Sequence, residues 1–508
     1  MKAARRLGGL AAGSVGRAAV AYAVLLLAAW PPSRLAAQQA PRRLTMAEAV
    51  RRALETGEEM RLAQAQLDQA RGQVQEAWSE GLPSLRASVT YQRTFASVFG
   101  GGGGGGTGST LPPFTPDTTL TLAERVRYLE NEYPNTLERQ VGGLFAATPF
   151  GRENAYTAQL VLTQTLYQGG KVGAGLRGAR AYERAARAGV EETRQDVVYR
   201  TKSAYLGALY AQRLLDITEG GRSHSAEQLR RVELNHRVGS SADYDLLRAQ
   251  VELANQEPQV IWARNQRDLA LLEVRRLVNL PLDEPIELDA AMLASQDSLP
   301  EVDLTALAGD VSSRAQLEVA EATVAFRREA VRVYRGDLLP NLRFQMIYGG
   351  QAFPSGTFPG GGDFRRDWNA TLTLSMPIFD GFRTRGQVAQ ARAELSRAEL
   401  ALQQSREFVA VEVEQARYEL ERARALVAAR RQTVTQASRA HYLASVRFTN
   451  GIATALEVSD ARLAMQQSQV NEAAATRDYL LSIAALERAF GRPAPVRRAG
   501  DRVVVSGR

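Results

Sequence analysis

The sequence has no cysteine among its 508 residues and only three histidines, His224, His236 and His441. Without cysteine the chain forms no disulfide, thiolate zinc site or iron–sulfur cluster, and it carries no lipid on an N-terminal cysteine. The histidines lie on charged stretches with no second ligand type nearby in the sequence. We therefore predict no metal site.

The formal net charge of +8 overstates how basic the chain is. Five basic residues fall within residues 1–37, a stretch that contains no acidic residue. Subtracting these five charges leaves +3 for the rest of the chain, which is not a nucleic-acid signature. We expect no nucleic-acid partner.

Residues 1–37 have the order of a secretory signal peptide. A basic stretch is followed by an apolar run over residues 18–30 and then by the small residues Ala36 and Ala37. The apolar run is shorter than the ~20 residues of a transmembrane helix, so an uncleaved anchor is the weaker alternative. We expect an exported protein whose mature chain begins close to Gln38.

An internal repeat organises the remaining sequence. Leu-Pro-x-Leu at 82–85 recurs at 339–342, and three later matches share an offset of 212: 166–169 with 378–381, 238–239 with 450–451, and 278–279 with 490–491. The extra residues of the first half include the seven glycines Gly100–Gly106, which predict a flexible loop. A duplicated half-molecule is the expected organisation.

The repeat gives the following predicted boundaries. The first repeat covers 44–281, with an N-terminal helix opening in a capping box at Thr45 and Glu48, strand 82–95, glycine-rich loop 96–153, strand 154–167 and a long helix pair over 171–278. A linker covers 282–316. The second repeat covers 317–491, with strands 339–350 and 367–379 and a helix pair over 383–490, and a C-terminal tail covers 492–508.

Each predicted strand alternates apolar and polar residues over the length of a tilted membrane-spanning strand. Four strands cannot close a transmembrane barrel, and an open edge is not viable in lipid. If the strands span a membrane, several chains must share one barrel. The alternative is a soluble four-stranded sheet with one face on a core, which the export signal and the long helices disfavour.

The helices that follow the strands are unusually long. Residues 387–450 contain neither glycine nor proline, and their apolar residues keep the 3–4 spacing of a coiled-coil seam. The stretch 171–237 would extend ~100 Å as a helix. Such a helix with a narrow apolar seam must pack sideways against neighbours.

These features resemble the TolC family of outer-membrane efflux proteins, the outer-membrane factors of tripartite pumps. The matching segments are 44–49, the Leu-Pro-x-Leu strand entries, 166–170, 378–381 and the helix tips 238–247 and 450–461. The resemblance implies an α+β membrane protein that forms a homotrimer. Four β-strands per chain would enter a shared 12-stranded outer-membrane barrel, and long coiled-coil helices would form a periplasmic α-barrel.

The resemblance also implies a function and partners. The protein would be a passive exit duct for efflux or type I secretion, with no enzymatic activity and no cofactor, in contact with outer-membrane lipid. It would work with a periplasmic adaptor and an inner-membrane pump of the RND, ABC or MFS type. The adaptor would dock at the helix tips: Val238, Gly239, Ser240, Asn450, Gly451 and Ile452.

The resemblance places a ring of acidic residues, Glu457, Asp460 and Asp245, at the periplasmic entrance. For Glu457 a capping box with Thr454 explains the carboxylate equally well. Relatives that lock the closed tip with tyrosine and arginine differ from this chain, which has Phe448 and Ala453 at those places.

Two other classes compete with this interpretation. Residues 173–178 match the dinucleotide motif GxGxxG, but the preceding strand alternates and the following helix is far too long for a βαβ unit. A periplasmic coiled-coil scaffold or adaptor would explain the helices but does not need four amphipathic strands.

Overall fold

The computed structural model describes residues 42–95, 117–131, 153–290, 299–302, 314–354, 356–494 and 496–497. The predicted signal peptide, the glycines Gly100–Gly106 and most of the predicted tail lie outside these ranges. Within them, no helix combines the length and the hydropathy needed to cross a bilayer.

The chain divides into two compact units. The sheet unit consists of residues 65–189 and 315–406, and the helix unit consists of residues 1–64, 190–314 and 407–508. The two longest helices, α5 (Lys171–Arg237) and α9 (Arg383–Thr449), contribute residues to both units.

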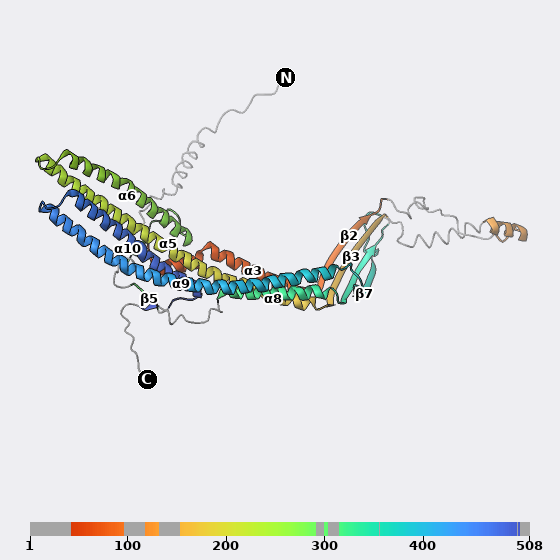
Figure 1. Ribbon diagram of the computed structural model, residues 1–508. Helices are drawn as coiled ribbons and strands as arrows, with labels where there is room; N and C mark the ends of the chain where they lie inside the picture. Colours follow the sequence, from red (N-terminus) through yellow and green to blue (C-terminus); the bar gives the residue numbers. More distant parts are fainter. Residues whose placement is uncertain are drawn as a thin grey trace, which may run out of the picture. The chain divides into compact units, whose positions relative to one another are not determined.

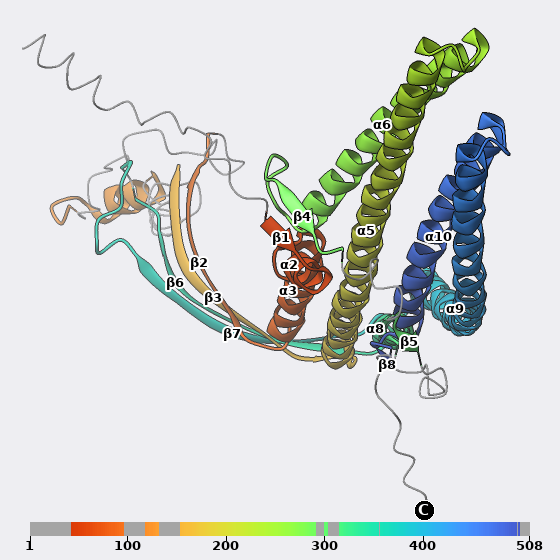
Figure 2. The same cartoon turned by 90° about the vertical axis from the view of Figure 1, so that its left-hand side faces the viewer.

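The sheet unit contains one four-stranded antiparallel sheet, which Figure 2 shows as a curved ribbon of long strands. Its order is β2 (Ser84–Arg93), β3 (Asn154–Gln168), β6 (Asn341–Ala352) and β7 (Arg365–Ser375). The register sets apolar residues against each other, such as Leu85 opposite Leu162 and Tyr348 opposite Trp368. This confirms the predicted apolar face of the strands. Strands β2 and β7 are the edges, so each pairs on one side only.

Seven helices carry most of the described residues (Figure 1). Besides α5 and α9 they are α2 (Met46–Thr56), α3 (Glu58–Ser79), α6 (Asp243–Leu277), α8 (Ala315–Gly336) and α10 (Ala455–Phe490). Two short pairs complete the helix unit: β1 (Arg42–Leu44) with β4 (Ile286–Leu288), and β5 (Glu301–Val302) with β8 (Val496–Arg497). The order α3-β2-β3-α5-α6 is followed by α8-β6-β7-α9-α10.

The capping box predicted at the start of α2 is only half formed. The Thr45 side chain accepts a hydrogen bond from the Glu48 amide at 3.2 Å, as expected. The Glu48 carboxylate instead accepts a bond from Arg42 at 3.2 Å. An ion pair with a neighbouring strand has therefore replaced the return bond to the cap.

Helices α5 and α8 pack closely through the glycine-rich start of α5. A Cβ added at Gly178 would lie within 3.5–3.7 Å of the side chains of Glu329 and Phe326. Arg177 forms an ion pair with Glu329 at 3.0 Å one position away. The third glycine of the GxGxxG match thus serves helix–helix packing.

Gly169 and Gly170 turn the chain from β3 into α5 with φ angles of +58° and +76°. A Cβ at Gly169 would lie 2.3 Å from the backbone oxygen of Gly336, whereas a Cβ at Gly170 would meet nothing within 4 Å. We expect Gly170→Ala to destabilise the protein by roughly 1–2 kcal/mol through its left-handed backbone, and Gly169→Ala to destabilise it further. Thermal unfolding of both purified variants measures the difference, and equal midpoints would contradict the clash.

Candidate functional site

The two helix hairpins of the helix unit end in turns of the same design. Gly239 and Gly451 have φ angles of +78° and +73°, after the ends of α5 and α9. In each turn the backbone amide of the residue after the glycine donates a hydrogen bond of 2.8 Å to the carbonyl oxygen five residues earlier. This is the arrangement of a Schellman motif. Val238 and Ile452 are about 70% exposed here (70% and 68%). The residues predicted to dock an adaptor therefore lie in exposed turns, and docking itself stays a prediction.

Glu457 is the third residue of α10, and its surroundings match the capping alternative. The Thr454 side chain accepts a bond from the Glu457 amide at 3.3 Å, and the Glu457 carboxylate accepts one from the Thr454 amide at 3.4 Å. Arg447, from the end of α9, lies 3.6 Å from the same carboxylate. The charge of Glu457 is thus partly balanced within one chain.

The other two predicted ring residues have different surroundings. Asp460 is exposed on α10, and no ion pair with it occurs among the described residues. Asp245 lies in the first turn of α6, where the Ser241 hydroxyl donates to it at 3.5 Å. Within the described part of one chain, no hydrogen bond joins Asp245 to Glu457 or Asp460. A ring therefore depends on further copies of the chain.

His236 has a carboxylate near it, contrary to the expectation from the sequence, whereas His224 and His441 lie beside each other. The Nε2 atom of His236, near the end of α5, lies 3.4 Å from a carboxylate oxygen of Asp243, the first residue of α6. The rings of His224 on α5 and His441 on α9 are 6.4 Å apart, and burial, followed by the charges of His224 and Arg462, lowers the pKa of His441. In the described ranges, no group of three or more potential ligands could hold a metal ion.

A buried polar layer near the tips was missed by the sequence reasoning. The Arg462 side chain on α10 is 7% exposed and forms an ion pair with Glu252 on α6. The Ser459 hydroxyl also donates to Glu252, at 3.1 Å. Four buried polar atoms at this level have no hydrogen-bond partner among the described residues: Ser225 Oγ, Gln256 Oε1, Arg462 Nη1 and Gln466 Oε1.

Farther from the tips the contact between these helices is apolar. Leu214, Leu215, Val260 and Ala263 form a buried cluster against Val470. Arg462 lies four residues after the buried Val458, so it occupies the face that α10 turns inward. A charged residue on a buried helix face was the available sequence signal for the layer.

We expect Glu252→Leu to destabilise the protein by about 3 kcal/mol, because it leaves the Arg462 charge buried without a partner. The double variant Glu252→Leu, Arg462→Met should recover most of this loss, since a well-packed apolar pair replaces the ions. Ser459→Ala, which removes one hydrogen bond, is the milder control at about 1 kcal/mol. Denaturant unfolding of these proteins and of the single variant Arg462→Met gives the coupling energy of the pair. A double variant no more stable than Glu252→Leu would contradict the pairing.

Comparisons with known proteins agree on one family. A model of outer membrane efflux proteins matches residues 49–280 and 311–492. Protein CyaE of Bordetella pertussis is 27% identical over 342 residues, 66% of this chain and 70% of CyaE. Outer membrane efflux protein BepC of Brucella suis is 23% identical over 336 residues, 66% of this chain and 72% of BepC.

The fold has known counterparts as well. The crystal structure of the Campylobacter jejuni CmeC outer membrane channel matches with a TM-score of 0.68 at 17% identity, over 88% of this chain and 85% of that one. The crystal structure of the outer membrane protein VceC from Vibrio cholerae matches with a TM-score of 0.67 at 17% identity, over 88% and 96%. The chain belongs to the outer membrane efflux protein family and is an outer-membrane protein.

Proposed function

We propose that the chain is the passive, non-enzymatic exit duct of a tripartite efflux or type I secretion assembly, and that three copies build the duct. The observation that carries this proposal is the four-stranded sheet whose edges β2 and β7 are both unpaired. An unpaired backbone edge costs several kcal/mol per polar group in lipid. Pairing β7 of one copy with β2 of the next removes both edges, and three copies give 12 strands.

The side chains of the edge strands support a lipid-facing sheet. Leu85, Val89, Trp368 and Leu372 are between 62% and 81% exposed in the single chain. They belong to the apolar face that the register makes continuous across the strands. An apolar face of this kind is stable where hydrocarbon covers it.

The long helices also leave apolar residues uncovered. The exposed ones include Tyr244, Leu247, Val251, Trp262 and Leu269 on α6, and Leu400, Phe408, Val411 and Tyr418 on α9. Their spacing of mostly three, four or seven residues is that of a helix-packing stripe. A neighbouring copy would cover these stripes and extend the barrel as a helical tunnel into the periplasm.

The partners follow from the same proposal. The exposed turns 238–240 and 450–452 would receive a periplasmic adaptor, and the energy would come from an inner-membrane pump of the RND, ABC or MFS type. BepC carries the name of an efflux protein and AprF of Pseudomonas aeruginosa that of an alkaline protease secretion protein, so the proposal includes both efflux and secretion.

The oligomeric state tests the proposal directly. We expect the mature protein, extracted from the outer membrane in mild detergent, to have the native mass of a trimer, because four strands cannot close alone. A stable monomer in the same detergent would rule out the shared barrel.

The acidic entrance gives a second test. Three copies of Asp460 and Glu457 at one constriction would favour cations over anions. In bilayer recordings under a salt gradient, we expect Asp460→Asn to move the reversal potential toward zero more than Glu457→Gln does, since Arg447 and the cap already engage Glu457. Glu457→Gln serves as the matched control for loss of one carboxylate. Unchanged reversal potentials in both variants, with intact trimers, would show that neither residue lines the entrance.

A further inference from the structure

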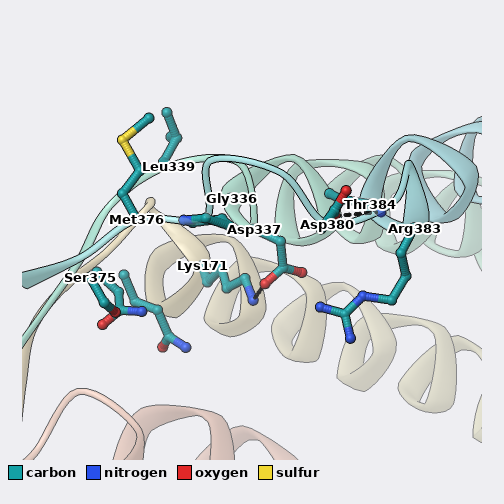
Figure 3. A pocket seen from close by; sticks show the side chains of 12 residues that line it. Lys171, Gly336, Asp337, Leu339, Ser375, Met376, Asp380, Arg383 and Thr384 are labelled. Carbon is teal, nitrogen blue, oxygen red and sulfur yellow. Dashed lines mark hydrogen bonds and ion pairs between the residues drawn. The ribbon is translucent and has the colours of Figure 1, made fainter.

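The turns that lead from β3 into α5 and from β7 into α9 meet at one pocket of the sheet unit (Figure 3). The pocket has a volume of about 400 Å³. Leu339 and Met376 lie together on one side of it, and the charged side chains of Lys171, Asp337 and Arg383 lie on another. The pocket thus has an apolar wall and a charged wall.

Both carboxylates of the pocket are already engaged. Asp337 forms an ion pair with Lys171. Asp380 accepts hydrogen bonds from the hydroxyl and the amide of Thr384, and these bonds, aided by the charge of Arg383, hold the pKa of Asp380 below its usual range. Each acid therefore has its own donor within the chain.

Arg383 is in a different position from Lys171, although the two occupy equivalent places in the 212-residue repeat. Its guanidinium extends away from the Asp380–Thr384 pair, and no described carboxylate lies within ion-pair distance of it. A guanidinium with its planar fork of donors free is suited to bidentate binding of a phosphate.

The residue before Arg383 has a strained backbone. Phe382 has a φ of +65°, a left-handed conformation that is an outlier for a bulky residue. Its equivalent in the first repeat is Gly170, which adopts a φ of +76° without such strain. The Phe382 side chain is 61% exposed, so burial within the chain does not compensate for the strain. Strain that packing does not explain points to a role outside the chain.

The neighbours of Phe382 form an exposed apolar rim beside the pocket. Ile378 is 99% exposed and Phe379 is 76% exposed. The rings of Phe379 and Phe382 meet edge to face at 5.6 Å, and the Arg385 guanidinium lies 5.4 Å from the centre of the Phe382 ring. Outer-membrane barrels carry girdles of aromatic residues at both membrane interfaces.

We propose that this pocket binds the phosphodiester headgroup of a phospholipid of the periplasmic leaflet. Arg383 binds the phosphate, and Phe379 and Phe382 contact the upper part of the acyl chains. The inference rests on the proposed function in one respect: the strands must span the outer membrane, which puts their α5 and α9 ends at the periplasmic surface.

The test compares the wild type with three variants purified from the outer membrane in mild detergent. Arg383→Gln removes the guanidinium that would bind the phosphate, and Phe382→Gly removes one aromatic ring of the rim and relieves the backbone strain. The control is Arg392→Gln, the same substitution at an exposed position farther along α9. Native mass spectrometry counts the phospholipids retained per chain after titration with phosphatidylglycerol or phosphatidylethanolamine, and separate titrations use inorganic phosphate.

We expect Arg383→Gln to bind phospholipid about tenfold more weakly, as for the loss of one charge-assisted hydrogen-bonded contact, and Arg392→Gln to bind it like the wild type. Phe382→Gly should also lose phospholipid while its thermal unfolding midpoint in detergent stays the same or rises. This combination separates lipid binding from simple destabilisation.

Three results would overturn the proposal. The first is equal phospholipid binding by Arg383→Gln and Arg392→Gln. The second is undiminished phospholipid binding by Phe382→Gly. The third is binding of inorganic phosphate to the wild type as tightly as phospholipid binds. A failure of the proposed function would be visible separately, as monomers in the same mass spectra.

Discussion

In the hydrocarbon of a membrane a backbone amide or carbonyl has no water to bind, and every such group must find its partner within the protein. In the proposed membrane-spanning arrangement, the inner strands of the sheet satisfy that constraint, whereas β2 and β7 of a single chain each have one edge without a paired strand. The two free edges make the single chain an incomplete unit. The exposed apolar stripes of α6 and α9 show the same incompleteness in the helices, where side chains rather than backbone groups lack a neighbour.

The helix unit is held together differently along its length. Away from the tips, the helices pack through a buried apolar cluster that includes Leu214, Leu215 and Val260. Separating the helices there would expose apolar surface to water. Near the tips, Arg462 and Glu252 form a buried ion pair among polar atoms that have no hydrogen-bond partner in the described part of the chain. A buried ion pair contributes little net stability compared with an apolar contact of the same size, although losing one partner is costly. The hairpins are therefore joined more weakly toward the end that would receive a partner protein.

The sequence predicts those parts of the fold that depend on local periodicity. Alternation identified the apolar face of each strand, and the glycines at 239 and 451 identified the turns, because a left-handed residue is required there. Strand order and register depend on contacts between distant segments, so alternation alone did not supply them. The Glu252–Arg462 pair was missed for the same reason, since its two residues are 210 positions apart. Even a short motif such as the capping box of α2 was not predicted in full. The Glu48 carboxylate accepts a hydrogen bond from Arg42 instead of from the backbone amide of Thr45.

The departures from the repeat carry information that the repeat itself does not. Where residues 212 apart share a local geometry, a difference in residue type reflects different surroundings. Gly170 and Phe382 both have left-handed backbones, yet only one of them carries a side chain, and that side chain is exposed. The buried Arg462 likewise corresponds to Gln250, which is exposed on α6. A left-handed phenylalanine and a buried arginine both cost stability, so each marks a place where the second half of the chain meets something that the first half does not.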